Sequence, residues 1–229
     1  MSSPKPQSSD PAEAAHYALL RRLAPALRHD MVGLFQPINM MAVLLEKHLQ
    51  AAAPDLLQLG KNGGSMKTLC RDASTTCVAL LGWLQPLGDE RVPLNAGIEG
   101  ALRLVSAELY LRGFKIVNQT AGQDMEVAQS MLRHVFLASL IALTDSAQVT
   151  ADLLLTAKLD KDELVLVIAL TAPGADGPLE GFQAYRALDF NDAQALADAE
   201  GVSLQRGPNS VSIVCRSGSP QSRAELSAS

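Results

Sequence analysis

Residues 20–49 read LRRLAPALRHDMVGLFQPINMMAVLLEKHL, and this stretch decides the architecture of the N-terminal part of the chain. Apolar side chains recur in it every three or four residues, which is the spacing of one face of an α-helix. At about 100° per residue they fall within a sector of roughly 80°. The members of this seam are Leu20, Leu23, Leu27, Met31, Leu34, Ile38, Met41, Leu45 and Leu49. A seam this long and narrow is typical of helical bundles.

The helix that carries the seam is expected to span residues 10–53. Asp10 is a suitable N-cap acceptor, Pro11 fits the first helical position, and Glu13 places an acid in the first turn. Pro25 and Pro37 lie inside the helix, where each removes an intrahelical hydrogen bond and favours a bend.

A second helix begins either at Asp55 or only near Ser65, because three intervening glycines, at 60, 63 and 64, each disfavour a helix by about 1 kcal/mol relative to alanine. Two long helices with a short connection form an antiparallel hairpin. A single hairpin cannot cover its apolar seam on both sides. We therefore expect two copies of the chain to pair as a homodimer with a four-helix bundle.

The pattern changes after residues 85–93, QPLGDERVP, whose prolines, glycine and charges mark a boundary. Helical patterns follow at 95–111, with Asn95 as the expected cap, at 126–146 and at 190–200. Strand patterns follow at 114–119, 149–159, 164–171, 202–206 and 211–216. These elements predict an α/β two-layer sandwich with a mixed or antiparallel sheet, so the fold class is α+β.

The expected domains are a helical hairpin over residues 10–88 and a sandwich over 92–216. Residues 1–9 and 217–229 are rich in serine, proline and small polar residues, and we expect both ends to be disordered.

The composition narrows the function classes. Among 229 residues, 19 Lys and Arg stand against 24 Asp and Glu, a net charge of −5 that argues against a nucleic-acid-binding protein. The three cysteines (Cys70, Cys77 and Cys215) lack the spacing of a zinc site or a disulfide framework. With no apolar leader and no apolar stretch near the ~20 residues that span a bilayer, we expect a cytoplasmic protein without a membrane partner.

His29 is the histidine whose position is informative. By the helical periodicity, the seam lies roughly 120° to 200° around the helix from His29, so the imidazole points away from the hairpin core. Asp30 follows directly, and a neighbouring carboxylate can hold the tautomer that a nucleophilic imidazole needs. On helix position alone, an ordinary solvated histidine would explain His29 better; the neighbouring residues, through the resemblance described next, make His29 and Asp30 the candidate catalytic residues. The candidate partner-docking residues around them are Arg22, Ala26, Arg28, Gly33 and Gln36.

The run LRHDMVGLFQP, residues 27–37, resembles the H-box of two-component sensor histidine kinases. In that family a phosphorylated histidine, followed by an acid and later by a proline, lies on the first helix of a dimeric hairpin. An ATP-binding (Bergerat) domain follows the hairpin. The resemblance covers residues 12–216 in element order and length, and it implies that His29 is a phosphoacceptor.

The sandwich departs from the family at the residues that bind ATP. The resemblance aligns residues 132–144, LRHVFLASLIALT, with a helix of the kinases whose asparagines hold magnesium and phosphates. In this chain, Ala138 and Ala142 stand at the positions of those asparagines. The family's glycine-rich turn, whose aspartate binds adenine, would fall at Thr171–Gly177, but nothing acidic stands at the expected place and Asp176 comes about five residues late. A glycine-rich lid is absent, and His134 fits a structural role. We therefore expect no ATP binding and no cofactor.

This combination resembles the histidine phosphotransferases of the ChpT type. The resemblance implies a phosphorelay in which His29 takes a phosphoryl group from the aspartate of one receiver domain and passes it to another. The implied partners are response-regulator receiver domains and a hybrid or sensor histidine kinase, with Mg²⁺ bound only on the receiver. Gly33 stands where bifunctional kinases often carry an amide or hydroxyl side chain, so we expect little phosphatase activity; Gln36 is a weak substitute.

Three alternatives remain open. The first is a catalytically inactive pseudokinase adaptor that regulates a receiver or a sensor kinase by binding it. The second is an active kinase with a divergent nucleotide pocket. The third is a scaffold that acts through the bundle alone.

Overall fold

The computed structural model describes residues 10–83, 90–122, 125–160, 163–178 and 186–216. The chain divides into two compact units, one of residues 1–22 with 88–229 and one of residues 23–87. The first helix therefore contributes to both units. The ends that were expected to be disordered, and residues 85–89 of the expected boundary, lie outside the described residues.

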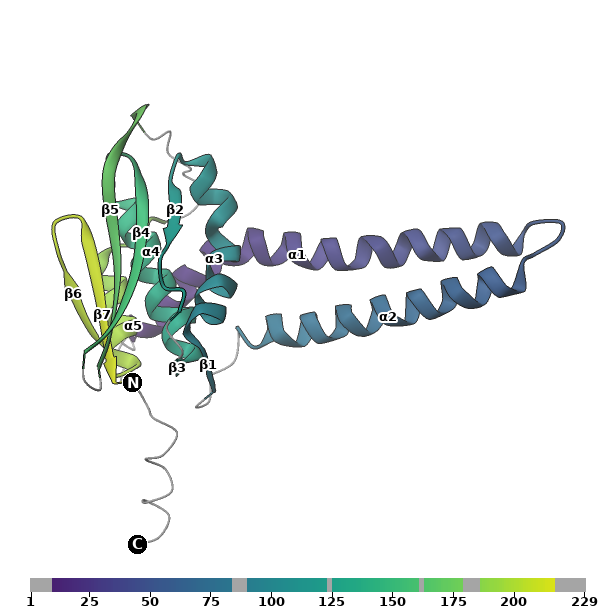
Figure 1. Ribbon diagram of the computed structural model, residues 1–229, viewed down its shortest axis with the longest axis horizontal. Helices are drawn as coiled ribbons and strands as arrows, with labels where there is room; N and C mark the ends of the chain where they lie inside the picture. The colour runs from purple at the N-terminus through teal and green to yellow at the C-terminus, as the bar shows by residue number, and fades with distance from the viewer. Residues whose placement is uncertain (1–9, 84–89, 123–124, 161–162, 179–185, 217–229) are drawn as a thin grey trace, which may run out of the picture. The chain divides into compact units, whose positions relative to one another are not determined.

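The helical unit contains most of two long helices, α1 (Pro11–Leu49) and α2 (Leu56–Leu81), which run antiparallel as a hairpin (Figure 1). The Asp10 carboxylate accepts the amide of Ala12 at 3.0 Å, as expected of an N-cap. Asp55 accepts the amide of Gln58 at 3.0 Å, so the earlier of the two expected starts of the second helix is correct. Both α1 and α2 are continuous, α1 through its two prolines and α2 through its glycines.

The larger unit is an α/β sandwich. Its main sheet has the strand order β2-β4-β5-β7-β6, with β2 and β4 parallel and the other pairs antiparallel. The bounds are β2 Lys115–Asn118, β4 Val149–Asp160, β5 Glu163–Pro178, β6 Ser203–Arg206 and β7 Ser210–Arg216. A second, two-stranded sheet pairs β1 (Arg91–Pro93) with β3 (Glu126–Ala128). The mixed sheet confirms the expected α+β class.

Helices cover one face of the main sheet (Figure 1). They are α3 (Leu94–Leu111), the π-helical segment η1 (Met131–Phe136), α4 (Leu137–Asp145) and α5 (Phe190–Ala199). Alternate strand residues such as Leu153 and Leu155, or Leu164 and Leu166, are fully buried against this layer. Alternation of period two is what a sheet with one covered face requires.

Three expectations need correction. Residues 126–128 were expected to begin a helix but form β3, because they pair with β1 from a distant part of the chain. Asn95 does not cap α3: Pro93 is the N-cap residue, and the Asn95 side chain donates to Glu99 at 3.1 Å. The backbone of the expected turn at 171–177 continues β5, which runs to Pro178.

Candidate functional site

His29 lies within α1, in the helical unit. Its side chain is 88% exposed. The Nδ1 atom lies 3.6 Å from Oδ1 of Asp30, whose own side chain is 37% exposed. That separation is longer than a hydrogen bond, so Asp30 acts on the imidazole as a nearby negative charge. Because Nδ1 faces the carboxylate, Nε2 is the ring nitrogen left to meet a reactant.

The expected docking residues around His29 are accessible, with one exception. Arg28, Gly33 and Gln36 are exposed and Ala26 is half-buried. A Cβ added at Gly33 would meet no atom within 4 Å, so the surface beside the histidine is open. Pro37 has no N–H to donate to the Gly33 carbonyl, which leaves that backbone acceptor without its usual helical donor.

Apolar side chains on the same side of α1 extend this surface. Val32, Met40 and Val43 are 60%, 61% and 57% exposed. At about 100° per residue, all three lie within roughly 60° of His29 around the helix axis. An exposed histidine beside a strip of exposed apolar side chains is a surface suited to contact with another protein.

Arg22 is the exception. It was expected on the exposed docking face, but its side chain is only 5% exposed. Its Nη2 atom donates to Glu108 at 2.5 Å and to Asp145 at 2.9 Å. Arg112 donates to the same two carboxylates, at 3.2 and 2.8 Å. Two guanidinium groups and two carboxylates thus neutralise one another inside the sandwich unit, and the Arg22 side chain is not available for docking.

Sequence reasoning missed this ion-pair cluster because it treated the first helix as a hairpin element from end to end. Residues 11–22 belong to the sandwich unit, and their buried members Ala15 and Leu19 lie on a different face from the seam. The spacing of these two residues, i and i+4, was the available signal of a second buried face.

Ala138 and Ala142, the two positions that the sequence resemblance aligned with magnesium-binding asparagines, are buried. Ala138 and Ala142 lie on α4 and are 0% and 5% exposed. A methyl group has no lone pair to offer to Mg²⁺, which requires a nearly complete shell of oxygen ligands. Among the described residues, no group of three or more His, Cys, Asp or Glu side chains could hold a metal ion.

The N-terminus of α5 is closed to an anion by the protein's own carboxylates. Asp189 accepts the amides of Asn191 and Asp192 at 2.8 and 3.0 Å, and Asp192 accepts the amide of Asp189 at 3.0 Å. Arg186 holds the pKa of Asp192 below its usual value by hydrogen bonding, although burial acts in the opposite direction. Amides that would attract a phosphate at a helix N-terminus are therefore already used.

His134 lies in η1 and is buried. Its Nδ1 atom is 2.7 Å from Oε1 of Glu200, and its ring contacts that of His16 from α1, with centroids 4.6 Å apart. These contacts join three elements of the sandwich unit, which fits the structural role expected for His134. Asp176, which was expected to stand too late in the chain for an adenine-binding aspartate, has its backbone in β5.

None of the helices described is long and apolar enough to cross a membrane.

Comparisons with known proteins find similarity among solved structures. No family model and no curated protein matches the sequence. The histidine kinase AdeS of Acinetobacter baumannii matches at 16% identity, over 80% of this chain and 98% of that chain, with a TM-score of 0.44. Histidine kinase ThkA in complex with the response regulator protein TrrA matches at 14% identity, over 90% and 64%, with a TM-score of 0.43. A bacterial phosphotransferase matches at 13% identity, over 93% and 99%, with a TM-score of 0.37. At these identities and scores, the similarities by themselves assign no activity to this chain.

Proposed function

We propose that this protein is a histidine phosphotransferase that relays phosphoryl groups between receiver-domain aspartates through a phosphohistidine at His29, without using ATP. The observation that carries the proposal is the 88% exposed His29 side chain, with Asp30 at its Nδ1 and an open surface beside it. The resemblance of residues 27–37 to the H-box supports the same assignment.

In the proposed reaction, this chain supplies mainly the nucleophile, the imidazole of His29, held where a receiver can reach it. Nε2 of neutral His29 attacks the phosphorus of an aspartyl phosphate on the receiver. The N–P bond forms, the P–O bond to the aspartate breaks, and the electron pair of that bond leaves with the carboxylate. Transfer to a second receiver is the reverse step, in which an aspartate oxygen attacks and the imidazole leaves. The receiver would supply Mg²⁺ and the cationic side chain that neutralise the moving group.

Asp30 would act as a positioning residue. A carboxylate beside Nδ1 favours the tautomer that carries its proton on that nitrogen, which keeps the lone pair on Nε2. As the phosphoryl group transfers, the imidazole gains positive charge, and the carboxylate stabilises that charge.

Two observations support a relay rather than an ATP-dependent kinase. The buried Ala138 and Ala142 offer no ligand to a magnesium–nucleotide complex. The carboxylates of Asp189 and Asp192 occupy the N-terminus of α5, where they would repel phosphates. A flat calorimetric titration with Mg-ATP is the expected result, and radiolabelling of the protein by ATP alone would establish the kinase instead.

The proposal includes a homodimer. The hairpin exposes large apolar side chains on both helices, among them Phe35 on α1 and Leu57 and Val78 on α2, at 50%, 72% and 70%. Light scattering should give twice the 24.3 kDa of one chain. Leu57→Glu combined with Val78→Glu should give the monomer, whereas a dimer that persists in this variant would place the interface elsewhere.

The decisive experiment is phosphotransfer profiling. Receiver domains of the source organism are phosphorylated by their own kinases with radiolabelled ATP, separated from the kinase, and mixed with this protein. Label should move to the wild type, resist base and be lost in acid, as expected of a phosphohistidine. The His29→Ala variant should take up none. The His48→Ala variant, which changes another histidine of the same helix, should behave as the wild type.

The same profiling separates the relay from the adaptor. Receivers that bind the wild type and the His29→Ala variant equally, with no label transferred to either, would establish the inactive adaptor. Transfer that survives His29→Ala would exclude His29 as the acceptor.

A further inference from the structure

The hairpin of α1 and α2 contains a buried polar side chain in an otherwise apolar seam. In the N-terminal half of α2, the less exposed side chains recur with the spacing of a heptad: Leu59, Asn62, Met66, Leu69 and Ala73. Four of these are apolar. Asn62 is the exception, and it is only 8% exposed. Because burial of an amide costs free energy unless its hydrogen bonds are made, the partners of Asn62 decide its role.

Asn62 makes one hydrogen bond within α2 and one to α1. Its Oδ1 atom accepts Nε2 of Gln58, one turn earlier, at 2.9 Å. Its Nδ2 atom lies 3.1 Å from Nδ1 of His48 on α1. Because the amide nitrogen can only donate, Nδ1 of His48 is the acceptor, and the neutral imidazole carries its proton on Nε2. The bond between His48 and Asn62 therefore ties one axial position of α1 to one of α2.

The side chains around this bond do little to fix the register of the two helices by their shape. Gly60, Gly63 and Gly64 flank Asn62, and a Cβ added at any of the three would meet no atom within 4 Å. Leu57 is 72% exposed. Side chains that interlock across a helix pair fix its register, and this end of the hairpin has few of them.

The connection between the two helices leaves room for a slip. It comprises residues 50–55, QAAAPD. A slip of one helical turn moves a helix by about 5.4 Å along its axis, a distance that two extended residues can span. After such a slip, the antiparallel pairing would bring Asn62 opposite Leu45 and His48 opposite Leu59. The Nδ2 atom of Asn62 would then be buried against apolar side chains without an acceptor.

We propose that the hydrogen bond between His48 and Asn62 fixes the register of α2 against α1, and that an apolar side chain in place of Asn62 permits a second register. A slipped hairpin loses this bond and leaves a buried amide unpaired, which disfavours the slipped register by about tenfold or more. A leucine meets apolar neighbours in either register and does not discriminate between them. This role concerns the hairpin alone and does not depend on phosphotransfer by His29.

The register can be measured as a distance between spin labels on the two helices. The labels are attached at Asn39→Cys and Lys61→Cys, exposed positions on α1 and α2, in the full chain. Because the two positions are offset along the hairpin, an axial slip changes the distance between them. The native cysteines are replaced by alanine. Dilution of each labelled chain with excess unlabelled chain restricts the double electron–electron resonance signal to distances within one chain.

The labelled chain with Asn62 intact should give a single distance. Asn62→Leu should add a resolved second population, whose distance differs by about 5 Å, close to the rise of one helical turn. Its midpoint of thermal unfolding, followed by circular dichroism, should be equal to or above that of the parent, because a buried polar group is replaced by an apolar one. The double variant His48→Leu with Asn62→Leu, which leaves neither partner unpaired, should give the same two populations.

Ser65→Leu, which adds the same side chain at an exposed position of α2, is the matched control and should keep the single distance. A single, unchanged distance in both Asn62→Leu and the double variant would overturn the proposal, whatever the midpoint of unfolding. So would a second population of equal size in Ser65→Leu. His29 lies on α1 and keeps its place in either register of α2, so its uptake of label tests the relay separately.

Discussion

Two residues of α1, Arg22 and His29, differ sharply in solvent exposure although they lie within two helical turns of one another. The His29 side chain is 88% exposed, whereas that of Arg22 is 5% exposed and bound to two carboxylates. Seven residues correspond to about 700°, so the two side chains project within roughly 20° of the same direction around the helix. What differs is the unit to which each belongs, since Arg22 packs within the sandwich and His29 lies in the hairpin.

Replacement of Asp30 should slow phosphotransfer without preventing receiver binding. Asp30→Asn removes the charge that favours a proton on Nδ1, and we expect the transfer rate to fall by up to about 100-fold. Asp30→Glu should recover part of it. Stopped-flow transfer from a phosphorylated receiver measures the rate, and its dependence on receiver concentration measures affinity. A loss confined to affinity, with the maximal rate intact, would show that Asp30 only contacts the partner.

Replacement of Arg22 should destabilise the sandwich unit. Arg22→Ala leaves Glu108 and Asp145 short of one of their two cations, and breaking a buried pair typically costs about 3–5 kcal/mol. Urea unfolding followed by circular dichroism measures the free energy of unfolding. Arg28→Ala, on the same helix but exposed, is the matched control and should stay within about 0.5 kcal/mol of the wild type. Equal effects of the two variants would contradict the assigned role of the cluster.

At the scale of elements, the glycines of α2 form a helix despite their low propensity. An added Cβ at Gly60, Gly63 or Gly64 would meet nothing within 4 Å in the single chain, and none of the three has a positive φ. Each replacement by alanine should therefore stabilise the hairpin by about 0.5–1 kcal/mol, which thermal unfolding measures. Gly113→Ala is the contrasting control and should destabilise, because its φ is +79° and Thr150 lies 2.5 Å from the added Cβ. If the α2 variants instead weaken the dimer, the glycines make room for the second copy.

The elements that could be predicted from the sequence are those fixed by local periodicity. The two hairpin helices, the hairpin of β6 and β7, and the helix at 190–199 follow from apolar spacing and turn residues within each segment. Residues 126–128 could not be predicted in this way, because their strand forms only by pairing with residues 91–93. The burial of Arg22 depends likewise on Glu108 and Asp145, which lie 86 and 123 residues further along the chain.

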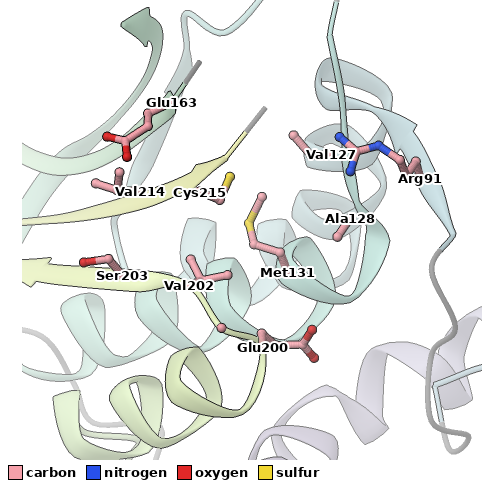
Figure 2. A pocket seen from close by; sticks show the side chains of 11 residues that line it. Arg91, Val127, Ala128, Met131, Glu163, Glu200, Val202, Ser203, Val214 and Cys215 are labelled. Atoms are coloured by element: carbon pink, nitrogen blue, oxygen red, sulfur yellow. The ribbon is translucent and has the colours of Figure 1, made fainter. Parts of the chain in front are cut away.

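The same distinction between local and long-range contacts applies to the functional features. His29 was accessible to sequence reasoning because a single helical face and a short motif define it. A cavity of about 500 Å³ between β1 and β7 (Figure 2) was not, because its lining comes from segments spread over residues 91–215 and none of them carries a recognisable pattern. A functional residue on one helix can be predicted from that segment alone, whereas a cavity forms only when distant segments pack together.

At the scale of the whole molecule, acid should weaken the attachment of residues 11–22 to the sandwich unit. Burial and the neighbouring His134 lower the pKa of His16, against the opposing effect of Glu200, so the packed state favours the neutral imidazole. The ring Nε2 atom of His16 is buried without a hydrogen-bond partner, and protonation of His16 would place a charge in this buried position. Because folding lowers the pKa of His16, this stabilisation is complete above the ordinary value of about 6.5 and is lost as pH falls below it.

Urea unfolding between pH 7.5 and 5.5 should show that the free energy of unfolding falls as pH falls, with a slope of up to about 1.4 kcal/mol per pH unit for one proton. His16→Gln should flatten that slope, whereas His29→Ala, which changes an exposed histidine, should keep it. A slope that survives His16→Gln would assign the pH dependence to other groups.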